Sequence, residues 1–121
     1  MIKTVPIKKN FEFLRAYKKG RYYAGRYLVL YALKNGSKTN RLGITVSRKI
    51  GKSVRRNRLK RLVRENYRFY EEFVADGVDL VFVVRSTEEM PGFFEVKSEM
   101  KFLFKRLGIF DQEKWNCLKN C

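Results

Sequence analysis

The sequence of 121 residues contains no histidine, and it has only 12 acidic residues against 28 lysines and arginines. Histidine is the commonest general acid and base near neutral pH. Without it, any chemistry must come from carboxylates, from metal ions or from a partner. The two cysteines, Cys117 and Cys121, stand close to the C-terminal end. Two thiols without histidine cannot supply the four ligands of a structural zinc site, so we expect free thiols in a reducing cytoplasm.

Long hydrophobic runs are also absent. No segment approaches the roughly 20 apolar residues of a membrane span, and the first residues lack the apolar stretch of a secretory signal. We therefore expect a cytoplasmic protein without a membrane-spanning segment. Hydrophobic residues nonetheless make up 45% of the chain and aromatic residues 15%. This is enough for the core of one domain of this length.

The positive charge is concentrated in two segments of the chain, whose formal net charge is +16. Residues 1–26 carry eight basic residues against one acidic residue, and residues 41–68 carry eleven against Glu65 alone. Residues 69–121 reverse the balance, with seven basic and ten acidic residues. A charge field of this kind calls for a polyanion, either a nucleic acid or an anionic membrane.

Hydrophobic spacing and turn residues predict the order of elements. Asn10 is a candidate cap for the first helix, and Gly20 is a candidate end. The turn signal Asn35-Gly36-Ser37 would make the first two strands a hairpin. The expected helices cover about residues 11–19, 53–75 and 93–107, with a short one near Trp115 and Leu118, and the expected strands cover residues 27–33, 41–47 and 79–85. The first strand is apolar on both of its faces, so both should be covered. This order indicates an α+β fold, or an α/β fold with a mixed sheet.

The segment from Ser53 to about Ala75 predicts a helix with two contrasting faces. The stretch before it, residues 47–53, is basic, and Gly51 permits a tight turn there. The free N–H groups at the start of the helix are suited to phosphate. The apolar arc contains Leu59, Leu62, Val63, Asn66, Phe69, Tyr70 and Phe73, and the cationic arc contains Arg56, Asn57, Lys60, Arg61, Arg64 and Arg68.

The run from Gly43 to Glu65 closely resembles the signature of the bacterial ribonuclease P protein component. The core of the resemblance is Arg-Asn-Arg at residues 56–58, followed by Lys60-Arg61 and Arg64. Residues 7–20 resemble the family's first helix, residues 27–33 its central strand, and residues 79–85 a later strand. Beyond about residue 110 the resemblance gives no information. We therefore expect a single RNA-binding domain over residues 1–121, with its core over about residues 7–110.

The resemblance implies the protein subunit of a ribonucleoprotein endonuclease that removes the 5′ leader of precursor tRNA. In this family the RNA subunit holds the catalytic metal site. The implied protein is therefore not catalytic alone and binds no cofactor, while magnesium acts in the RNA-containing holoenzyme. The implied partners are the catalytic RNA subunit and precursor tRNA, without a membrane and without an obligate protein partner. The implied fold is a small α/β sandwich with a mixed sheet, whose basic helix makes a left-handed β-α-β crossover against the general right-handed rule.

The resemblance also assigns two groups of site residues. Arginine binds phosphate oxygens bidentately, and aromatic rings stack on unpaired bases. The residues implied to bind the RNA subunit are Arg48, Lys49, Lys52, Arg56, Asn57, Arg58, Lys60, Arg61, Arg64 and Arg68, and those implied to bind the single-stranded leader are Phe13, Tyr17 and Tyr31, with Tyr27 and Val29 as neighbours that could share the surface. The residues by themselves leave two alternatives open. The aromatic side chains could be core residues, and Asn57 could make a cap or a tertiary contact.

Three other functions compete with this interpretation. A structural RNA-binding protein of ribosomal type would show the same charge but would need no aromatic cleft. A helix-turn-helix DNA regulator would place its basic helix after another helix, whereas a strand is expected before it here. A nuclease that acts without RNA would need clustered carboxylates for its metal. The acids of the basic two thirds, Glu12 and Glu65, are expected on helix surfaces.

Overall fold

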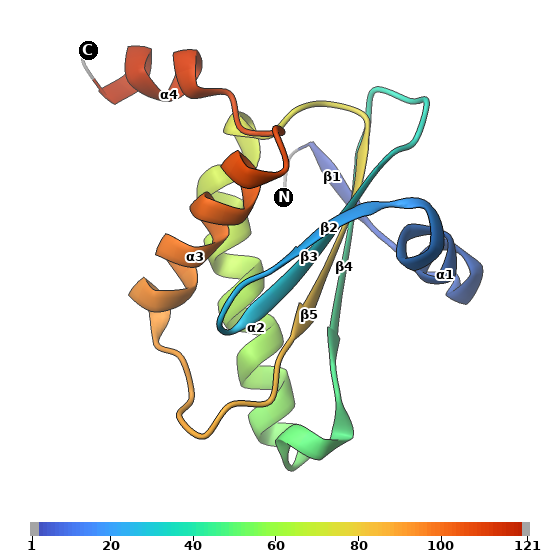
Figure 1. Cartoon of the computed structure of the whole chain (residues 1–121), viewed down its shortest axis with the longest axis vertical. Coiled ribbons are helices and arrows are strands. Elements are labelled where there is room, and N and C mark those ends of the chain that lie inside the picture. Colours follow the sequence, from blue (N-terminus) through green and yellow to red (C-terminus); the bar gives the residue numbers. More distant parts are fainter. Residues whose placement is uncertain (1–2, 120–121) are drawn as a thin grey trace.

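The computed structural model describes residues 3–119, and in this part of the chain five strands form one mixed sheet (Figure 1). The strands are β1 (Thr4–Pro6), β2 (Arg21–Ala24), β3 (Leu28–Lys34), β4 (Asn40–Val46) and β5 (Val78–Val84). Their spatial order is β1-β4-β5-β3-β2. β4 runs parallel to both β1 and β5, whereas β3 runs antiparallel to β5 and β2. The expected α+β class with a mixed sheet is confirmed.

Helices cover both faces of this sheet. They are α1 (Asn10–Lys19), α2 (Ser53–Tyr70), α3 (Phe93–Arg106) and α4 (Gln112–Lys119), with 3-10 turns η1 (Arg48–Ile50) and η2 (Glu71–Phe73). Figure 1 shows α1 on one face of the sheet and α2 and α3 together on the other. Within residues 3–119 no helix combines the length and the apolar character needed to span a bilayer.

The alternation of β3 explains how one sheet carries two helical layers. Leu28, Leu30 and Ala32 are buried in the main core, which α2 and α3 close from one side. Val29 and Tyr31 point to the opposite face and are half-buried there. Successive strand residues point to opposite faces, so a strand that is apolar throughout needs cover on both sides, as expected.

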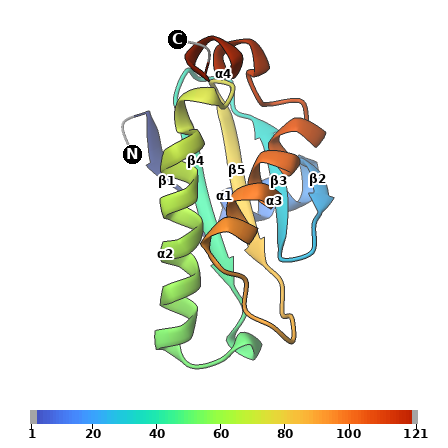
Figure 2. The same ribbon diagram turned by 90° about the vertical axis from the view of Figure 1, so that its left-hand side faces the viewer.

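The connection from β4 through α2 to β5 is left-handed. In Figure 2, α2 lies in front of the sheet, β4 and β5 both run downwards, and the chain passes from β4 on the left to β5 on the right. If this view is turned upside down so that both strands point upwards, the helix stays in front and the chain passes from β4 on the right to β5 on the left. A right-handed connection would pass from left to right in this orientation. About 98% of parallel crossovers have the opposite hand. The exception implied by the family resemblance is therefore present.

The expected hairpin between the strands at 27–33 and 41–47 is wrong. β5 lies between β3 and β4, and Phe82 of β5 pairs with Leu30 on one side and with Ile44 on the other. β5 is buried along almost its whole length. Such a strand gains most from a central position, where both edges are paired and both faces are covered. The turn at residues 35–37 is real, but it leads to the strand beyond β5.

Two short strands and two helix boundaries also differ from expectation. β1 and β2 have only three and four residues, too few for a clear period-2 pattern. Lys9, not Asn10, is the N-cap of α1, and its backbone N–H donates to the Glu12 carboxylate at 3.3 Å. α2 ends at Tyr70 and continues as the turn η2. Tyr67, absent from the predicted apolar arc, is completely buried.

Candidate RNA interface

The outer face of α2 forms an open cationic groove. The groove, of about 490 Å³, is lined by Asn57, Lys60, Arg61, Arg64, Glu65 and Arg68. The only acid among these residues, Glu65, accepts a hydrogen bond from Nε of Arg61 at 3.2 Å. Both side chains are exposed to solvent, at 79% and 45%, so this pair is weak and leaves the groove strongly positive. The structure therefore brings five of the ten residues implied to bind the RNA subunit onto one surface. That surface is called the α2 groove below.

Arg56 does not line the α2 groove. Its side chain is half-buried, and its Nε atom is buried without a hydrogen-bond partner within the described residues. Arg56 lies three residues before Leu59 and seven before Val63, both of which are buried against the sheet. Residues at these spacings lie on the same side of a helix. Placing Arg56 well within the cationic arc was therefore wrong, because it lies at the edge of that arc, next to the buried side of the helix.

The remaining basic residues gather near the start of α2. Arg48 and Lys49 are exposed on η1, where the backbone N–H of Lys49 donates to Oγ of Ser47 at 3.2 Å. Lys52 is the N-cap residue of α2. A second groove of about 590 Å³ is lined by Gly51, Lys52, Val54, Arg55, Arg58 and Met90. Arg58 thus faces a different groove from Arg61 and Arg64.

On the opposite face of the sheet, α1 and β3 bring aromatic side chains together. Phe13, Tyr17 and Tyr31 are half-buried and pack around the buried Ala16 and Val81. The ring of Tyr17 meets the ring of Tyr31 edge-on, with centroids 4.9 Å apart. The three side chains are neither fully buried nor freely exposed. A ring that is held by packing but partly open to solvent can stack with an unpaired base. They are called the aromatic cluster below.

A close approach of α1 to the sheet sets the position of this cluster. The ring of Phe13 lies against the backbone of Gly43 in β4, where a Cβ atom would overlap the ring. Only glycine permits this contact. The hydroxyls of Tyr17 and Thr45 lie 3.5 Å apart two residues further along β4.

The other two residues offered for leader binding have different surroundings. Val29 is half-buried on the same face as the aromatic cluster and pairs with Val83 across β3 and β5. Tyr27 instead packs against the main core, and its backbone N–H donates to the carboxylate of Glu99 on α3. The structure therefore does not bring Tyr27 to the aromatic cluster. The reason is that β3 begins at Leu28, so the alternation of the strand does not extend to Tyr27.

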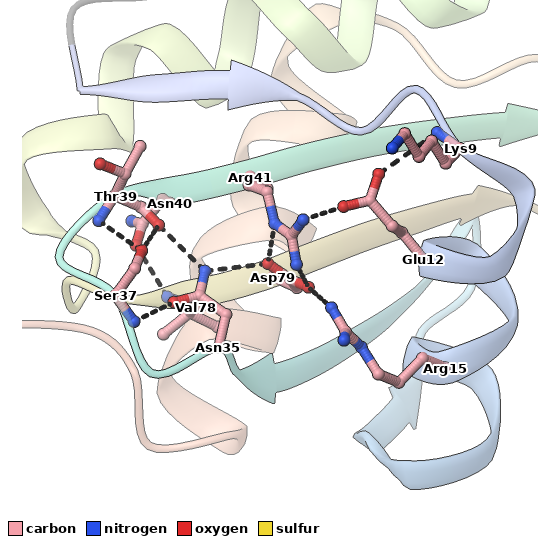
Figure 3. A network of polar contacts seen from close by, with 10 residues as sticks. All are labelled: Lys9, Glu12, Arg15, Asn35, Ser37, Thr39, Asn40, Arg41, Val78 and Asp79. Atoms are coloured by element: carbon pink, nitrogen blue, oxygen red, sulfur yellow. Dashed lines mark hydrogen bonds and ion pairs between the residues drawn. The ribbon is translucent and has the colours of Figure 1, made fainter.

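A polar network fastens α1 to the sheet beside the aromatic cluster (Figure 3). Nε and Nη2 of Arg41 donate to the two carboxylate oxygens of Asp79 at 2.7 and 2.6 Å, and Nη1 of Arg41 pairs with Glu12 of α1. Asn35 donates to Asp79 at 2.9 Å, and Arg15 lies 3.5 Å from it. The expectation of a surface position for Glu12 is wrong: its side chain is buried because Arg41 compensates its charge.

Sequence reasoning missed one aromatic residue beside the cluster. Tyr22 of β2 stacks on Tyr31, with ring centroids 5.3 Å apart and planes inclined by 29°. The alternation of side chains in Arg21–Ala24 could have indicated that Tyr22 and Tyr23 point to opposite faces of a sheet. This signal was not usable, because no strand was expected at these residues. Among residues 3–119 no group of three His, Cys, Asp or Glu side chains is placed to hold a metal ion. Cys117 is exposed and free, and Cys121 lies outside the described residues.

A cationic helix groove and an aromatic cluster on opposite sides of one sheet define a class: a small α+β RNA-binding domain. The comparisons with known proteins agree and are more specific. The family model "Ribonuclease P" matches residues 1–108. The ribonuclease P protein component of Clostridium botulinum strain Langeland is 43% identical over 111 residues, which are 91% of this chain and 100% of that protein.

Solved structures show the same relationship. The ribonuclease P protein of Staphylococcus aureus superposes with a TM-score of 0.79 at 33% identity, covering 87% of this chain and 96% of that one. The ribonuclease P protein of Thermotoga maritima superposes with a TM-score of 0.76 at 38% identity, covering 84% of this chain and 96% of that one. The chain belongs to the ribonuclease P protein family. Its function is that of a protein subunit of ribonuclease P in the 5′ processing of tRNA.

Proposed function

We propose that this chain binds the catalytic RNA subunit through the α2 groove and the single-stranded leader of precursor tRNA through the aromatic cluster. The observation that carries the proposal is the separation of the two surfaces. α2 lies on one face of the sheet and α1 on the other (Figure 1). One protein can therefore contact a folded RNA and a single strand without competition between them.

The chemistry of the α2 groove suits a folded RNA. Arg61, Arg64 and Arg68 recur at intervals of three and four residues, so their guanidinium groups follow one side of the helix. Each guanidinium presents parallel N–H donors that match two phosphate oxygens. A rigid helix with such a spacing can contact several phosphates of a folded RNA at once. Contacts with phosphates supply most of the affinity for a nucleic acid but do not distinguish its sequence.

The chemistry of the aromatic cluster suits unpaired bases. Double-stranded RNA hides its base faces, whereas a single strand can place them on aromatic rings. Tyr17 and Tyr31 offer rings that are only half-buried, and Val29 and Val83 extend the apolar floor beside them. The leader of a precursor tRNA is single-stranded, and the mature tRNA lacks it.

In this proposal the protein is an accessory subunit and catalysis belongs to the RNA. The sequence has no histidine. Of the three buried carboxylates among the described residues, Glu12 and Asp79 pair with Arg41, and Glu71 accepts a hydrogen bond from the backbone N–H of Lys3. We propose that magnesium acts in the RNA-containing holoenzyme, that the protein alone binds no cofactor, and that the complex works in the cytoplasm. The alternative of a structural protein of ribosomal type is not favoured, because the family match is to ribonuclease P.

The test is cleavage of a precursor tRNA by the cognate RNA subunit, with and without the protein, at low and at high magnesium. We expect the protein to raise cleavage most at low magnesium, because added positive charge replaces part of the need for cations. The protein without RNA should cleave nothing. Magnesium-dependent cleavage by RNA-free protein would contradict the accessory role, and an RNA subunit indifferent to the protein would contradict the partnership.

A further inference from the structure

Tyr22 extends the aromatic cluster by one strand. It lies on β2, which forms the edge of the sheet next to β3, and it is the direct cross-strand partner of Tyr31. The two rings stack with centroids 5.3 Å apart. Tyr17, Tyr31 and Tyr22 thus form a row that starts at α1 and ends at the edge of the sheet. Within this row Tyr22 is the outermost ring, and 62% of its surface is exposed.

The neighbouring Tyr23 shows that packing does not explain Tyr22. Tyr23 points to the other face of the sheet, is half-buried against the main core, and meets the ring of Phe102 edge-on at 5.7 Å. The guanidinium of Arg106 lies over its ring at 4.9 Å. Burial and ring contacts therefore account for Tyr23. A ring that stays mostly in water gains little from the hydrophobic effect, so a stabilising role does not account for Tyr22.

The stacking changes which surface of the cluster a base can reach. One face of Tyr31 is covered by Tyr22, and the ring also meets Tyr17 edge-on. Tyr22 has only its inner face covered, because within the described residues no strand follows β2 in the sheet. A base that arrives from solvent at this edge therefore meets the outer face of Tyr22 before it meets Tyr31.

We propose that Tyr22 is a stacking platform for a nucleotide of the leader, beyond the nucleotides held at Tyr17 and Tyr31. The inference rests on the proposed function. An aromatic ring accepts any base, so this platform adds affinity for longer leaders with little preference for sequence. Lys18 and Lys19, which are exposed in the last turn of α1, come shortly before Tyr22 in the chain. They supply positive charge for the phosphates of the same strand.

The test uses the reconstituted holoenzyme and precursor tRNAs whose leaders differ by one nucleotide. Tyr22→Ala should lose about 5- to 100-fold in affinity, the range of one base–aromatic stack, and only for leaders long enough to reach β2. Tyr22→Phe keeps the ring and should keep the affinity. Phe94→Ala is the matched control, because Phe94 is 74% exposed but lies on α3, across the sheet. It should bind every leader as the unchanged protein does.

A second measurement locates the contact. The fluorescent base 2-aminopurine is placed at successive leader positions, where stacking on an aromatic ring quenches it. One position should be quenched with the unchanged protein and with Tyr22→Phe, and bright with Tyr22→Ala. If the leader raises the affinity of the unchanged protein for tRNA, but Tyr22→Ala leaves both the affinity and the quenching unchanged, the inference about Tyr22 is overturned and the proposed function stands. If no leader raises the affinity of the unchanged protein, the proposed function fails and the inference fails with it. Equal losses for precursor and mature tRNA would also overturn the inference, since Tyr22 would then act through the fold.

Discussion

Arg41 and Asp79 face each other on the neighbouring strands β4 and β5, and the guanidinium holds both oxygens of the carboxylate at 2.6 and 2.7 Å. The Asp79 side chain is completely buried, where an uncompensated charge is costly. The same guanidinium pairs with Glu12 of α1 (Figure 3). One arginine therefore neutralises a carboxylate inside the sheet and anchors the helix that carries Phe13 and Tyr17.

The first prediction concerns this anchor. Arg41→Met keeps most of the aliphatic volume but leaves Asp79 without its bidentate partner. Breaking a buried pair costs about 3–5 kcal/mol. We expect the lower end of that range, because Asn35 and Arg15 still contact Asp79. Urea unfolding measures the decrease in the free energy of unfolding. Arg61→Met is the control, since it breaks the exposed pair with Glu65 and should cost less than about 1 kcal/mol. Similar small losses in both variants would show that Arg41 is not an anchor.

A second prediction concerns the pH dependence of stability. The hydroxyls of Tyr67 and Thr4 share a buried hydrogen bond of 2.8 Å, and burial raises the pKa of Tyr67 above its ordinary value of 10.0. In the unfolded chain this tyrosine therefore ionises at lower pH than in the folded protein. Its contribution to the free energy of unfolding is fully present below pH 10 and falls as the pH rises toward the folded pKa.

Tyr67→Phe removes this alkaline dependence. At neutral pH it should cost about 0.5–1.5 kcal/mol, the worth of one hydrogen bond. Above pH 10 its free energy of unfolding should fall less steeply than that of the unchanged protein, as measured by urea unfolding at a series of pH values. Identical slopes for Tyr67→Phe and the unchanged protein would refute the assignment.

The sequence predicted best those elements whose pattern repeats over several turns or along a whole strand. α2 and α3 repeat their apolar residues at helical spacing, and β5 is apolar throughout, so each was expected close to its observed position. The partner of a strand is not part of such a pattern. Alternation in β3 and β4 shows which side chains share a face, but it does not show that β5 is inserted between the two strands. Only the packed sheet determines this pairing.

The site was predictable to a similar degree. The α2 groove follows from helical spacing, since Arg61, Arg64 and Arg68 lie on the exposed side of the helix. Arg56 lies at the boundary between the two arcs, where exposure depends on how the helix sits on the sheet and not on the helix alone. Glu12 is buried because Arg41, distant in the chain, meets it in space. Tyr22 joins the cluster only through pairing with β3. These errors have one cause, namely contacts between residues far apart in sequence.

The third prediction concerns the α2 groove. Arg61 and Arg64 are exposed and line the groove without supporting the core. The double variant Arg61→Ala/Arg64→Ala should keep its fold and weaken binding of the RNA subunit. In a plot of log affinity against log salt, the slope should become shallower by about 0.7–0.9 for each phosphate that the variant no longer neutralises. Arg56 is unsuitable for this test, because its half-buried side chain would confound stability with binding.

The control for this prediction removes charge elsewhere. Lys38 is exposed in the connection between β3 and β4, away from α2. Lys38→Ala lowers the net charge by one, as each groove substitution does, but should leave the salt slope unchanged. If Lys38→Ala flattened the slope as much as a groove substitution does, binding would depend on total charge rather than on the α2 groove.

The last prediction concerns the aromatic cluster. Tyr17 and Tyr31 present half-buried rings that meet edge-on, and removal of one base–ring stack costs about 1–3 kcal/mol. Tyr17→Ala or Tyr31→Ala should therefore weaken binding of precursor tRNA to the holoenzyme by about 5- to 100-fold. Mature tRNA has no leader to place on these rings, so its affinity should hardly change. Affinities for both tRNAs, measured with each variant, test the difference.

The contrast between the two tRNAs separates leader binding from its alternatives. A general folding defect would weaken both ligands and alter the circular dichroism of the variant. A defect in assembly would resemble Arg61→Ala/Arg64→Ala and appear as weaker binding of the RNA subunit before any tRNA is added. Only a surface that contacts the leader lowers the affinity for precursor tRNA while leaving assembly and mature tRNA unaffected. Equal losses for both tRNAs in a folded, assembled variant would assign Tyr17 and Tyr31 to the packing of α1 on the sheet.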